Sequence, residues 1–209
     1  MADKVCTFIM AGGRGERLHP LTRDRAKPAV PFGGIYRIID ITLSNCINSG
    51  LRKMHILTQY KSISLDRHIR MGWNIFAGEL GEYIDIIPAQ QRIDEHWYQG
   101  TADSIYQNIY SIEMEKPELV LILAGDHIYK MNYLEMIKFH REHNAEATVG
   151  VVELPKERSS HLGGVEVDGL SRVTGFSEKP QNPRTLIDNP NLIYGSMWIY
   201  LFNTDILKD

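Results

Sequence analysis

Strand-like apolar runs alternate with helical patterns along most of this chain. Strands are expected where apolar residues run together or alternate with polar ones, and helices where apolar residues recur every three or four positions. Glycine and polar residues end several of these patterns. The pattern predicts strands over 5–10, 54–58, 83–87, 119–124 and 147–152, and helices over 40–49, 63–71, 101–115 and 133–143.

The last third of the chain has a different pattern, in which strands follow one another. Strands are predicted over 164–167, 172–176 and 193–202, and residues 204–209 read as the first turn of a helix. Strand–helix alternation followed by a β-rich end predicts an α/β fold with a mostly parallel, doubly wound (Rossmann-like) sheet and helices on both faces. In such sheets ligands bind outside the carboxyl ends of the strands.

Composition places the chain among ordinary globular proteins. Its 209 residues suit one substantial α/β core, and the apolar fraction of 43% is typical. A net charge of −3 gives no general affinity for nucleic acid or anionic membranes. The two cysteines, Cys6 and Cys46, are too few for a disulfide framework and suggest small core residues in a reducing compartment. With no secretion signal and no long apolar run, we expect a cytoplasmic protein.

A glycine-rich loop follows the first predicted strand, in the sequence Ala11-Gly-Gly-Arg-Gly-Glu-Arg-Leu18. Glycines leave the main chain open to a ligand, and bare backbone N–H groups form an anion cradle. The loop is neither a Walker loop nor a dinucleotide fingerprint, since Leu18 stands where the third glycine would be. A plain structural turn is the alternative. The nearby cations Arg14, Arg17, Arg25 and Lys27 favour a phosphate-binding loop.

Asp126 stands at the end of the most apolar strand, directly after Gly125. A carboxylate there is costly unless it is paired or binds a metal. It either caps the next segment or binds Mg²⁺, which typically takes one or two carboxylates together with phosphate oxygens. His127 suits neither role and is interpreted as a positioning or structural residue.

Two further segments carry weaker signals. The stretch 175–180 ends a strand with Glu178, Lys179 and a proline, and a solvated turn is the alternative interpretation. The stretch 97–103 places Trp97 and Tyr98 before a predicted helix, where a nucleoside base could stack, and a packed loop is the alternative.

These motifs, in this order, resemble the catalytic domain of bacterial glucose-1-phosphate adenylyltransferases (ADP-glucose pyrophosphorylases), within the sugar-phosphate nucleotidyltransferase superfamily. The resemblance covers nearly the whole chain. It is carried by residues 11–18, 25–30, 32–34, 37–40, 43–50, 58–60, 88–92, 97–98, 100–103, 123–129 and 178–180. Residues 43–50 and the Gly-Asp-His-Ile-Tyr segment at 125–129 distinguish this branch from thymidylyl- and uridylyltransferases.

The resemblance implies transfer of AMP from ATP to α-D-glucose 1-phosphate, with Mg²⁺, giving ADP-glucose and pyrophosphate for glycogen- or starch-type glucan synthesis. By similarity, the catalytic residues are Arg14, Lys27, Asp126 and Lys179, and Asp126 holds the metal. The nucleotide-binding residues are Ala11, Gly12, Gly13, Gln59, Gln90, Tyr98, Gly100 and Thr101. The sugar-phosphate-binding residues are Gly163, Glu178, Lys179 and Ser196, with Lys179 as the phosphate partner. The resemblance also implies a homo-oligomer, a tetramer in the full-length family, with no nucleic-acid or membrane partner.

Three departures from the family pattern leave alternatives open. Asp24 stands where bacterial members carry a lysine linked to activator binding, and Trp198 stands where the family usually has glycine. Residues 1–209 are expected to form one catalytic domain that stops before the family's second metal-binding aspartate and its C-terminal left-handed β-helix. We therefore expect nucleotide binding with weak or no turnover. The alternatives are a non-catalytic regulatory subunit, a relative that uses dTTP or UTP, and a nicotinamide dehydrogenase.

Overall fold

The fold is that of a computed structural model, which describes residues 4–90 and 96–208. The chain divides into two compact units. One comprises the chain up to Thr148 together with the segment from Leu201 onward, and the other runs from Val149 to Tyr200. Each unit is described on its own below.

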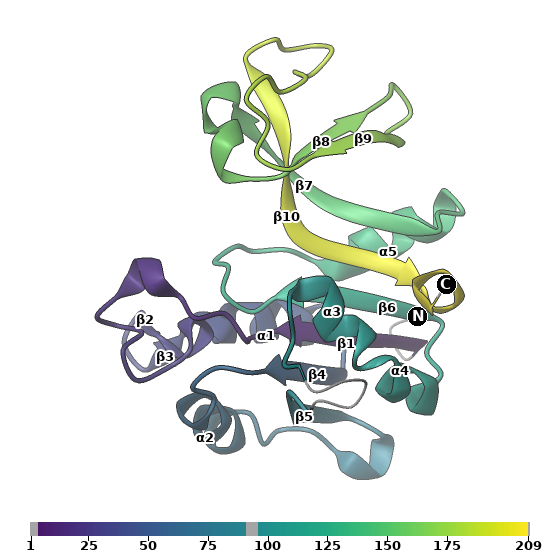
Figure 1. The fold of residues 1–209 in the computed structure, drawn as a ribbon. Helices are drawn as coiled ribbons and strands as arrows, with labels where there is room; N and C mark the ends of the chain where they lie inside the picture. Colours follow the sequence, from purple (N-terminus) through teal and green to yellow (C-terminus); the bar gives the residue numbers. More distant parts are fainter. Residues whose placement is uncertain (1–3, 91–95, 209) are drawn as a thin grey trace. The chain divides into compact units, whose positions relative to one another are not determined.

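The first unit is built on a parallel sheet in the order β5-β4-β1-β6 (Figure 1). Its central strands are the most apolar segments of the chain, and every residue of β6 is buried. Burial on both faces is expected of parallel strands, because helices cover both sides of such a sheet. The strands are β1 (Val5–Met10), β4 (Lys53–Thr58), β5 (Tyr83–Pro88) and β6 (Leu119–Ala124).

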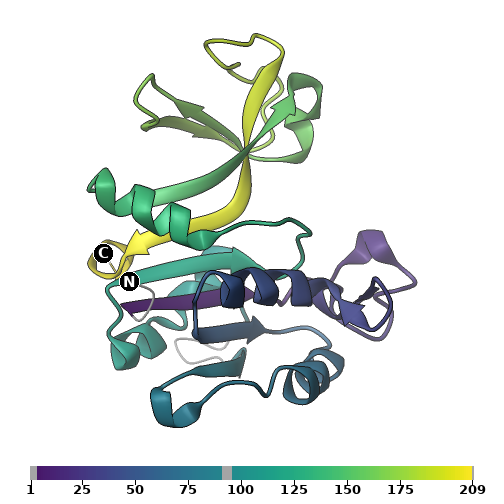
Figure 2. The ribbon, with the colours of Figure 1, turned by 180° about the vertical axis from the view of Figure 1, so that it is seen from behind.

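Helices lie on both faces of this sheet, which confirms the predicted α/β fold. In Figure 1, α3 and α4 lie in front of the strands, and Figure 2 shows α1 and α5 on the opposite face. The helices are α1 (Ile38–Asn48), α2 (Ile63–Gly72), α3 (Thr101–Tyr106), α4 (Ile109–Glu115), α5 (Tyr133–Glu142) and α6 (Thr204–Lys208). Short elements are the hairpin β2 (Pro31–Phe32) and β3 (Tyr36–Arg37) and the 3₁₀ turns η2 (Glu16–Leu18), η3 (Lys27–Ala29) and η4 (Gly78–Leu80).

The second unit is mainly antiparallel. Within it, β10 pairs with β8 and β8 pairs with β9, with Tyr194 opposite Val165 and Val165 opposite Phe176. The remaining strand, β7, also pairs with β10. The elements are β7 (Ala147–Pro155), whose first two residues belong to the first unit, the 3₁₀ turn η5 (Lys156–His161), β8 (Gly164–Val167), β9 (Val173–Ser177) and β10 (Leu192–Asn203), whose last three residues belong to the first unit.

The single helix predicted over 101–115 is wrong, because the segment forms two helices that break at Asn108. The side-chain amide of Asn108 donates to the carbonyl of Ser104 at 2.7 Å. That carbonyl is the one the backbone N–H of Asn108 would use in a continuous helix. The N–H instead bonds the carbonyl of Ile105 at 2.9 Å. Side-chain competition for backbone groups of this kind is typical of asparagine.

No helix within the described residues is both long enough and apolar enough to cross a bilayer. Both cysteines are free and buried, as the sequence predicts. Burial raises the pKa of the Cys6 thiol to about 12 and also raises the pKa of Cys46. Both thiols are therefore protonated at neutral pH, and a protonated thiol is a poor nucleophile.

We predict that neither thiol of the native protein reacts on mixing with a disulfide reagent at pH 8. In denaturing urea both should react at once, because the unfolded thiols regain a pKa near 8.5. Counting released chromophore with and without urea measures this. Rapid release of one equivalent from the native protein would contradict the burial described above.

Candidate functional site

The glycine loop leaves β1 at its carboxyl end. The N–H of Ala11 bonds the carbonyl of Leu57 at 2.8 Å, which holds the start of the loop against β4. A Cβ at Gly12 would lie 3.2 Å from Cβ of Gln59, whereas a Cβ at Gly13 would meet nothing within 4 Å. Glycine at position 12 therefore lets Gln59 approach the main chain. The fold brings these predicted nucleotide-binding residues side by side.

Gly15 has a positive φ of 67°, a conformation that glycine adopts without steric cost. A Cβ at this position would lie 2.8 Å from Cβ of Lys27 and 3.0 Å from Cγ2 of Thr22. The Thr22 hydroxyl donates to the Gly15 carbonyl at 2.9 Å. Gly15 thus allows the turn that contains Lys27 to pack directly on the loop.

Lys27 and Asp126, two of the predicted catalytic residues, form an ion pair with Nζ 2.8 Å from Oδ2. Their side chains are 32% and 29% exposed, so solvent reaches the pair. His127 Nε2 lies 3.7 Å from the other carboxylate oxygen. The pair sits at the carboxyl ends of parallel strands, the edge at which such sheets bind ligands.

Gly125 explains how Asp126 reaches this place. Its N–H bonds the carbonyl of Met10 at 2.9 Å, which joins the end of β6 to the end of β1. A Cβ at Gly125 would lie 3.1 Å from Cγ2 of Ile9 and 3.2 Å from that same carbonyl oxygen. A larger residue would push the chain away and would carry Asp126 with it.

The predicted nucleoside contacts gather near the ends of β4 and β5. Gln59 donates its side-chain amide to the carbonyl of Tyr98 at 3.3 Å, and Asn108 donates to the Tyr98 hydroxyl at 2.8 Å. Burial raises the pKa of Tyr98, so its hydroxyl is neutral at physiological pH. Gly100 and Thr101 begin α3. Gln90 follows Ala89, whose N–H bonds the Thr58 carbonyl at 2.9 Å, while Gln91 and Arg92 of the same motif lie outside the described residues.

Tyr60 is a neighbour of the loop that sequence reasoning missed. The guanidinium carbon of Arg14 lies 5.8 Å from the centre of its ring, and Lys61 Nζ lies 4.8 Å away. Cations at these distances are attracted to the face of an aromatic ring. An aromatic residue directly after Gln59 was the available signal.

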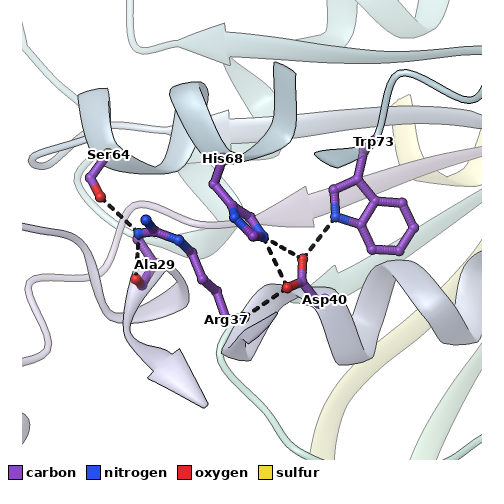
Figure 3. A network of polar contacts seen from close by, with 6 residues as sticks. All are labelled: Ala29, Arg37, Asp40, Ser64, His68 and Trp73. Carbon is purple, nitrogen blue, oxygen red and sulfur yellow. Dashed lines mark hydrogen bonds and ion pairs between the residues drawn. The ribbon is translucent and has the colours of Figure 1, made fainter. Parts of the chain in front are cut away.

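A buried carboxylate, Asp40, links three elements around the site (Figure 3). Its oxygens accept from the N–H of Arg37 at 2.7 Å and from Nε1 of Trp73 at 2.8 Å, and they lie 2.8 and 2.9 Å from Nε2 of His68. Arg37 in turn donates to the carbonyl of Ala29 at 2.7 Å. We call this set the Asp40 network, and it joins α1, α2 and the turn η3 that contains Lys27.

Polar residues in α1 and at its C-terminal end hold the segment that follows Asp126. Asn45 donates to the Tyr129 carbonyl at 2.9 Å, and Ser49 Oγ accepts from the N–H of Tyr133 at 2.8 Å. Both lie in the stretch 43–50, one of the motifs that carry the resemblance. The structure gives that stretch a physical role, since it fixes the chain on the far side of Asp126.

The four residues predicted to bind the sugar phosphate all lie in the second unit. The N–H of Ser196 bonds the carbonyl of Gly163 at 2.8 Å. A Cβ at Gly163 would lie 3.3 Å from a carboxylate oxygen of Glu178. Lys179 Nζ is 3.3 Å from Glu178, and both side chains are more than half exposed. Ser196 is only 2% exposed, so its hydroxyl faces protein.

Comparison with known proteins identifies the family. The sequence profile of the family described as nucleotidyl transferase matches residues 6–209. This chain belongs to the nucleotidyl transferase family.

Named relatives lie within this family at high identity. Each is called glucose-1-phosphate adenylyltransferase, which confirms the resemblance inferred from the sequence. The Rhodopirellula baltica protein is 58% identical over 99% of this chain and 47% of its own length. The Koribacter versatilis protein is 59% identical over 95% of this chain and 48% of its own length. The Methylococcus capsulatus protein is 53% identical over 99% of this chain and 49% of its own length. The chain therefore spans about half the length of the curated relatives it matches.

We predict that Gly15→Ala lowers the free energy of unfolding of this nucleotidyl transferase by roughly 2 kcal/mol. The added methyl group must occupy a left-handed conformation and also meets Lys27. Urea titration measures the change, with Gly13→Ala as the matched control in the same loop. Equal stability of the two variants would contradict the close packing described for Gly15.

A second expectation concerns the Asp40 network. Asp40→Ala leaves several buried donors without an acceptor, and we expect a loss of about 3 kcal/mol in stability. Asp66→Ala is the control, because it removes a carboxylate that pairs with Arg70 on the exposed side of α2. That change should cost less than about 1 kcal/mol. Similar melting temperatures for both variants would show that Asp40 contributes no more to stability than the exposed Asp66.

Proposed function

We propose that this chain is the catalytic part of a glucose-1-phosphate adenylyltransferase, which transfers AMP from ATP to α-D-glucose 1-phosphate. The products are ADP-glucose and pyrophosphate, the former a donor for glycogen- or starch-type glucan synthesis. The observation that carries the proposal is the Lys27–Asp126 pair beside the glycine loop. The names of the relatives support the choice of substrates.

The reaction needs no protein nucleophile. A phosphate oxygen of glucose 1-phosphate forms a bond to the α-phosphorus of ATP, and the bond from that phosphorus to the oxygen bridging to the β-phosphate breaks. The pair of electrons leaves with pyrophosphate. Catalysis therefore depends on in-line positioning and on neutralising phosphate charge. Gly12, Gly13, Arg14 and Lys27 suit these tasks, because they combine open backbone with fixed cations.

Asp126 fits the role of a Mg²⁺ ligand. Its carboxylate is partly exposed at the strand ends, and Mg²⁺ commonly takes one or two carboxylates plus substrate phosphate oxygens. Within residues 4–90 and 96–208 no three His, Cys, Asp or Glu side chains are grouped to hold a metal alone. When bound, the ion would neutralise charge on the phosphates. Lys27 would then be free to bind phosphate oxygens, since an ion pair that solvent reaches can exchange its partner for a ligand.

The exposed side chains of the second unit suit the sugar phosphate. In the proposal, Lys179 binds the phosphate and Glu178 accepts hydrogen bonds from sugar hydroxyls. Gly163 lets Glu178 approach the main chain, and Ser196 supports Gly163 through its backbone N–H. This division gives the first unit the nucleotide and the second unit the sugar phosphate.

Cellular context follows from the same proposal. ATP and glucose 1-phosphate are cytoplasmic metabolites, and we place the protein there, as a homo-oligomer without nucleic-acid or membrane partners. Arg14, Lys27, Asp126 and Lys179 are all present, which favours an enzyme over a non-catalytic regulatory subunit.

The proposal predicts that two substitutions separate the two ligands. Asp126→Ala should abolish Mg²⁺-dependent ATP binding, whereas Lys179→Ala should weaken glucose 1-phosphate at least tenfold and leave ATP within about twofold, because it removes a charge-assisted contact. Isothermal titration with each ligand measures both, beside a pyrophosphate-release assay.

Controls in the same assay test the identity of the substrates. When ATP, UTP and dTTP are supplied together, the protein should use ATP in preference to the other two nucleotides. The product should be ADP-glucose. Wild-type protein that binds neither ATP nor glucose 1-phosphate would refute the proposed function. If both substitutions weakened both ligands equally, the division into two halves would be wrong.

A further inference from the structure

The chain between β6 and α5, residues 125–132, forms neither helix nor strand. Near its start lies Asp126, the proposed Mg²⁺ ligand. A segment without a ladder of hydrogen bonds of its own needs other partners for its backbone groups, because unpaired N–H and C=O groups away from water are costly. The position of Asp126 therefore depends on groups that neighbouring elements supply.

A row of polar residues along α1 supplies several of these groups. Thr42, Asn45 and the C-cap residue Ser49 are spaced by three and four positions, the spacing of neighbours on one side of a helix. Their exposed fractions are 0%, 6% and 0%. A helix normally buries its apolar face, and a buried polar group is costly unless it is hydrogen-bonded. The partners of this row lie on both sides of Asp126 in the sequence.

Thr42 holds the chain immediately before Asp126. Its hydroxyl donates to the carbonyl of Ala124, the last residue of β6, at 3.3 Å. The next residue, Gly125, donates its N–H to the carbonyl of Met10 at 2.9 Å. The two residues that precede Asp126 are thus tied to α1 and to the end of β1, respectively.

Asn45 holds the chain after Asp126. Its side-chain amide donates to the carbonyl of Tyr129 at 2.9 Å, and its side-chain oxygen accepts from the N–H of Met131 at 3.5 Å. One side chain therefore pairs with a backbone acceptor and a backbone donor two residues apart, as a neighbouring strand would. The hydroxyls of Tyr129 and Tyr133 lie 2.6 Å apart, which ties the same segment to the start of α5.

We propose that Thr42 and Asn45 are positioning residues for the Mg²⁺ site at Asp126. They act on the backbone on either side of the carboxylate and bind no ligand themselves. Mg²⁺ demands near-ideal octahedral geometry, so its affinity depends on where the carboxylate stands. Loss of a group that orients a metal ligand typically lowers metal affinity by roughly tenfold to a hundredfold. The inference rests on the proposed function and adds to it two residues outside the predicted site.

The first test removes the hydroxyl of Thr42 and keeps the shape of its side chain. In excess Mg²⁺, Thr42→Val should weaken ATP binding about threefold to tenfold, the usual effect of losing one buried hydrogen bond. With a chelator in place of Mg²⁺, ATP binding should stay within about twofold of wild type. Thr42→Ser retains the hydroxyl and should restore the effect of Mg²⁺. Isothermal titration under the two conditions measures this.

The matched control lies at the other end of the same strand. The Thr204 hydroxyl donates to the carbonyl of Pro117, two residues before β6 begins, at 2.8 Å. Thr42→Val and Thr204→Val should both lower the melting temperature, since each removes a hydrogen bond to a backbone carbonyl. Only Thr42→Val should reduce the gain in ATP affinity that Mg²⁺ provides. A merely structural role for Thr42 predicts the same behaviour for both variants.

The second test removes both contacts of Asn45. Asn45→Ala should reduce the gain in ATP affinity provided by Mg²⁺ by at least about tenfold, because the chain after Asp126 loses its donor and its acceptor together. ATP binding in the presence of a chelator should again change little. An Asn45→Ala protein that is folded and retains the full effect of Mg²⁺ would overturn the role assigned to Asn45.

The outcomes distinguish this inference from the proposed function. Wild-type protein that fails to bind ATP with Mg²⁺ would refute the proposed function, and the inference with it. Wild-type protein that binds ATP with Mg²⁺, with Thr42→Val lowering only the melting temperature, would refute the inference alone. If Asn45→Ala fails to fold, the comparison of Thr42→Val with Thr204→Val still decides.

Discussion

The hydrogen bonds of the Asp40 carboxylate are the interaction on which the proposed nucleotide half of the site depends. Removing a charge from water is expensive, and a buried carboxylate is stable only when several donors replace its hydration. Here those donors come from the start of α1, from α2 and from the chain after α2. Because Arg37 also holds the carbonyl of Ala29, the same network fixes the turn that begins with Lys27. A carboxylate outside the proposed ligand-binding set thus fixes the turn that carries Lys27, the proposed catalytic cation.

The charges at the site itself are arranged differently. Lys27 and Asp126 are partly exposed and satisfy each other, whereas Asp40 is enclosed and has rigid partners. A solvated ion pair contributes little stability and can be exchanged for ligand contacts, while a buried network contributes order and resists exchange. The groups proposed to respond to a ligand are therefore separate from the groups that keep them in place.

The sequence predicted most of this fold because its strands are strongly apolar and its helices strongly periodic. That Lys27 and Asp126 lie near each other could also be predicted from the sequence, since parallel strands bring their carboxyl ends, and the loops that follow them, to one edge of the sheet. The role of Asp40 was not predictable from pattern, because it depends on His68 and Trp73, whose proximity only the packing of α1 against α2 creates. The break at Asn108 was missed for a related reason. Apolar periodicity continues across it, and the deciding hydrogen bonds come from one side chain.

The break between α3 and α4 at Asn108 also affects the loop that precedes α3. The amide of Asn108 is shared between the Ser104 carbonyl, whose capture ends α3, and the hydroxyl of Tyr98 in the preceding loop. The discontinuity in the helix and the anchoring of the loop are thus two results of a single amide group. A substitution of Asn108 that restored a continuous helix would also remove the hydrogen bond to the Tyr98 hydroxyl and would leave Gln59 as the partner of the Tyr98 carbonyl. At this position the continuity of the helix and the anchoring of the Tyr98 ring are therefore alternatives.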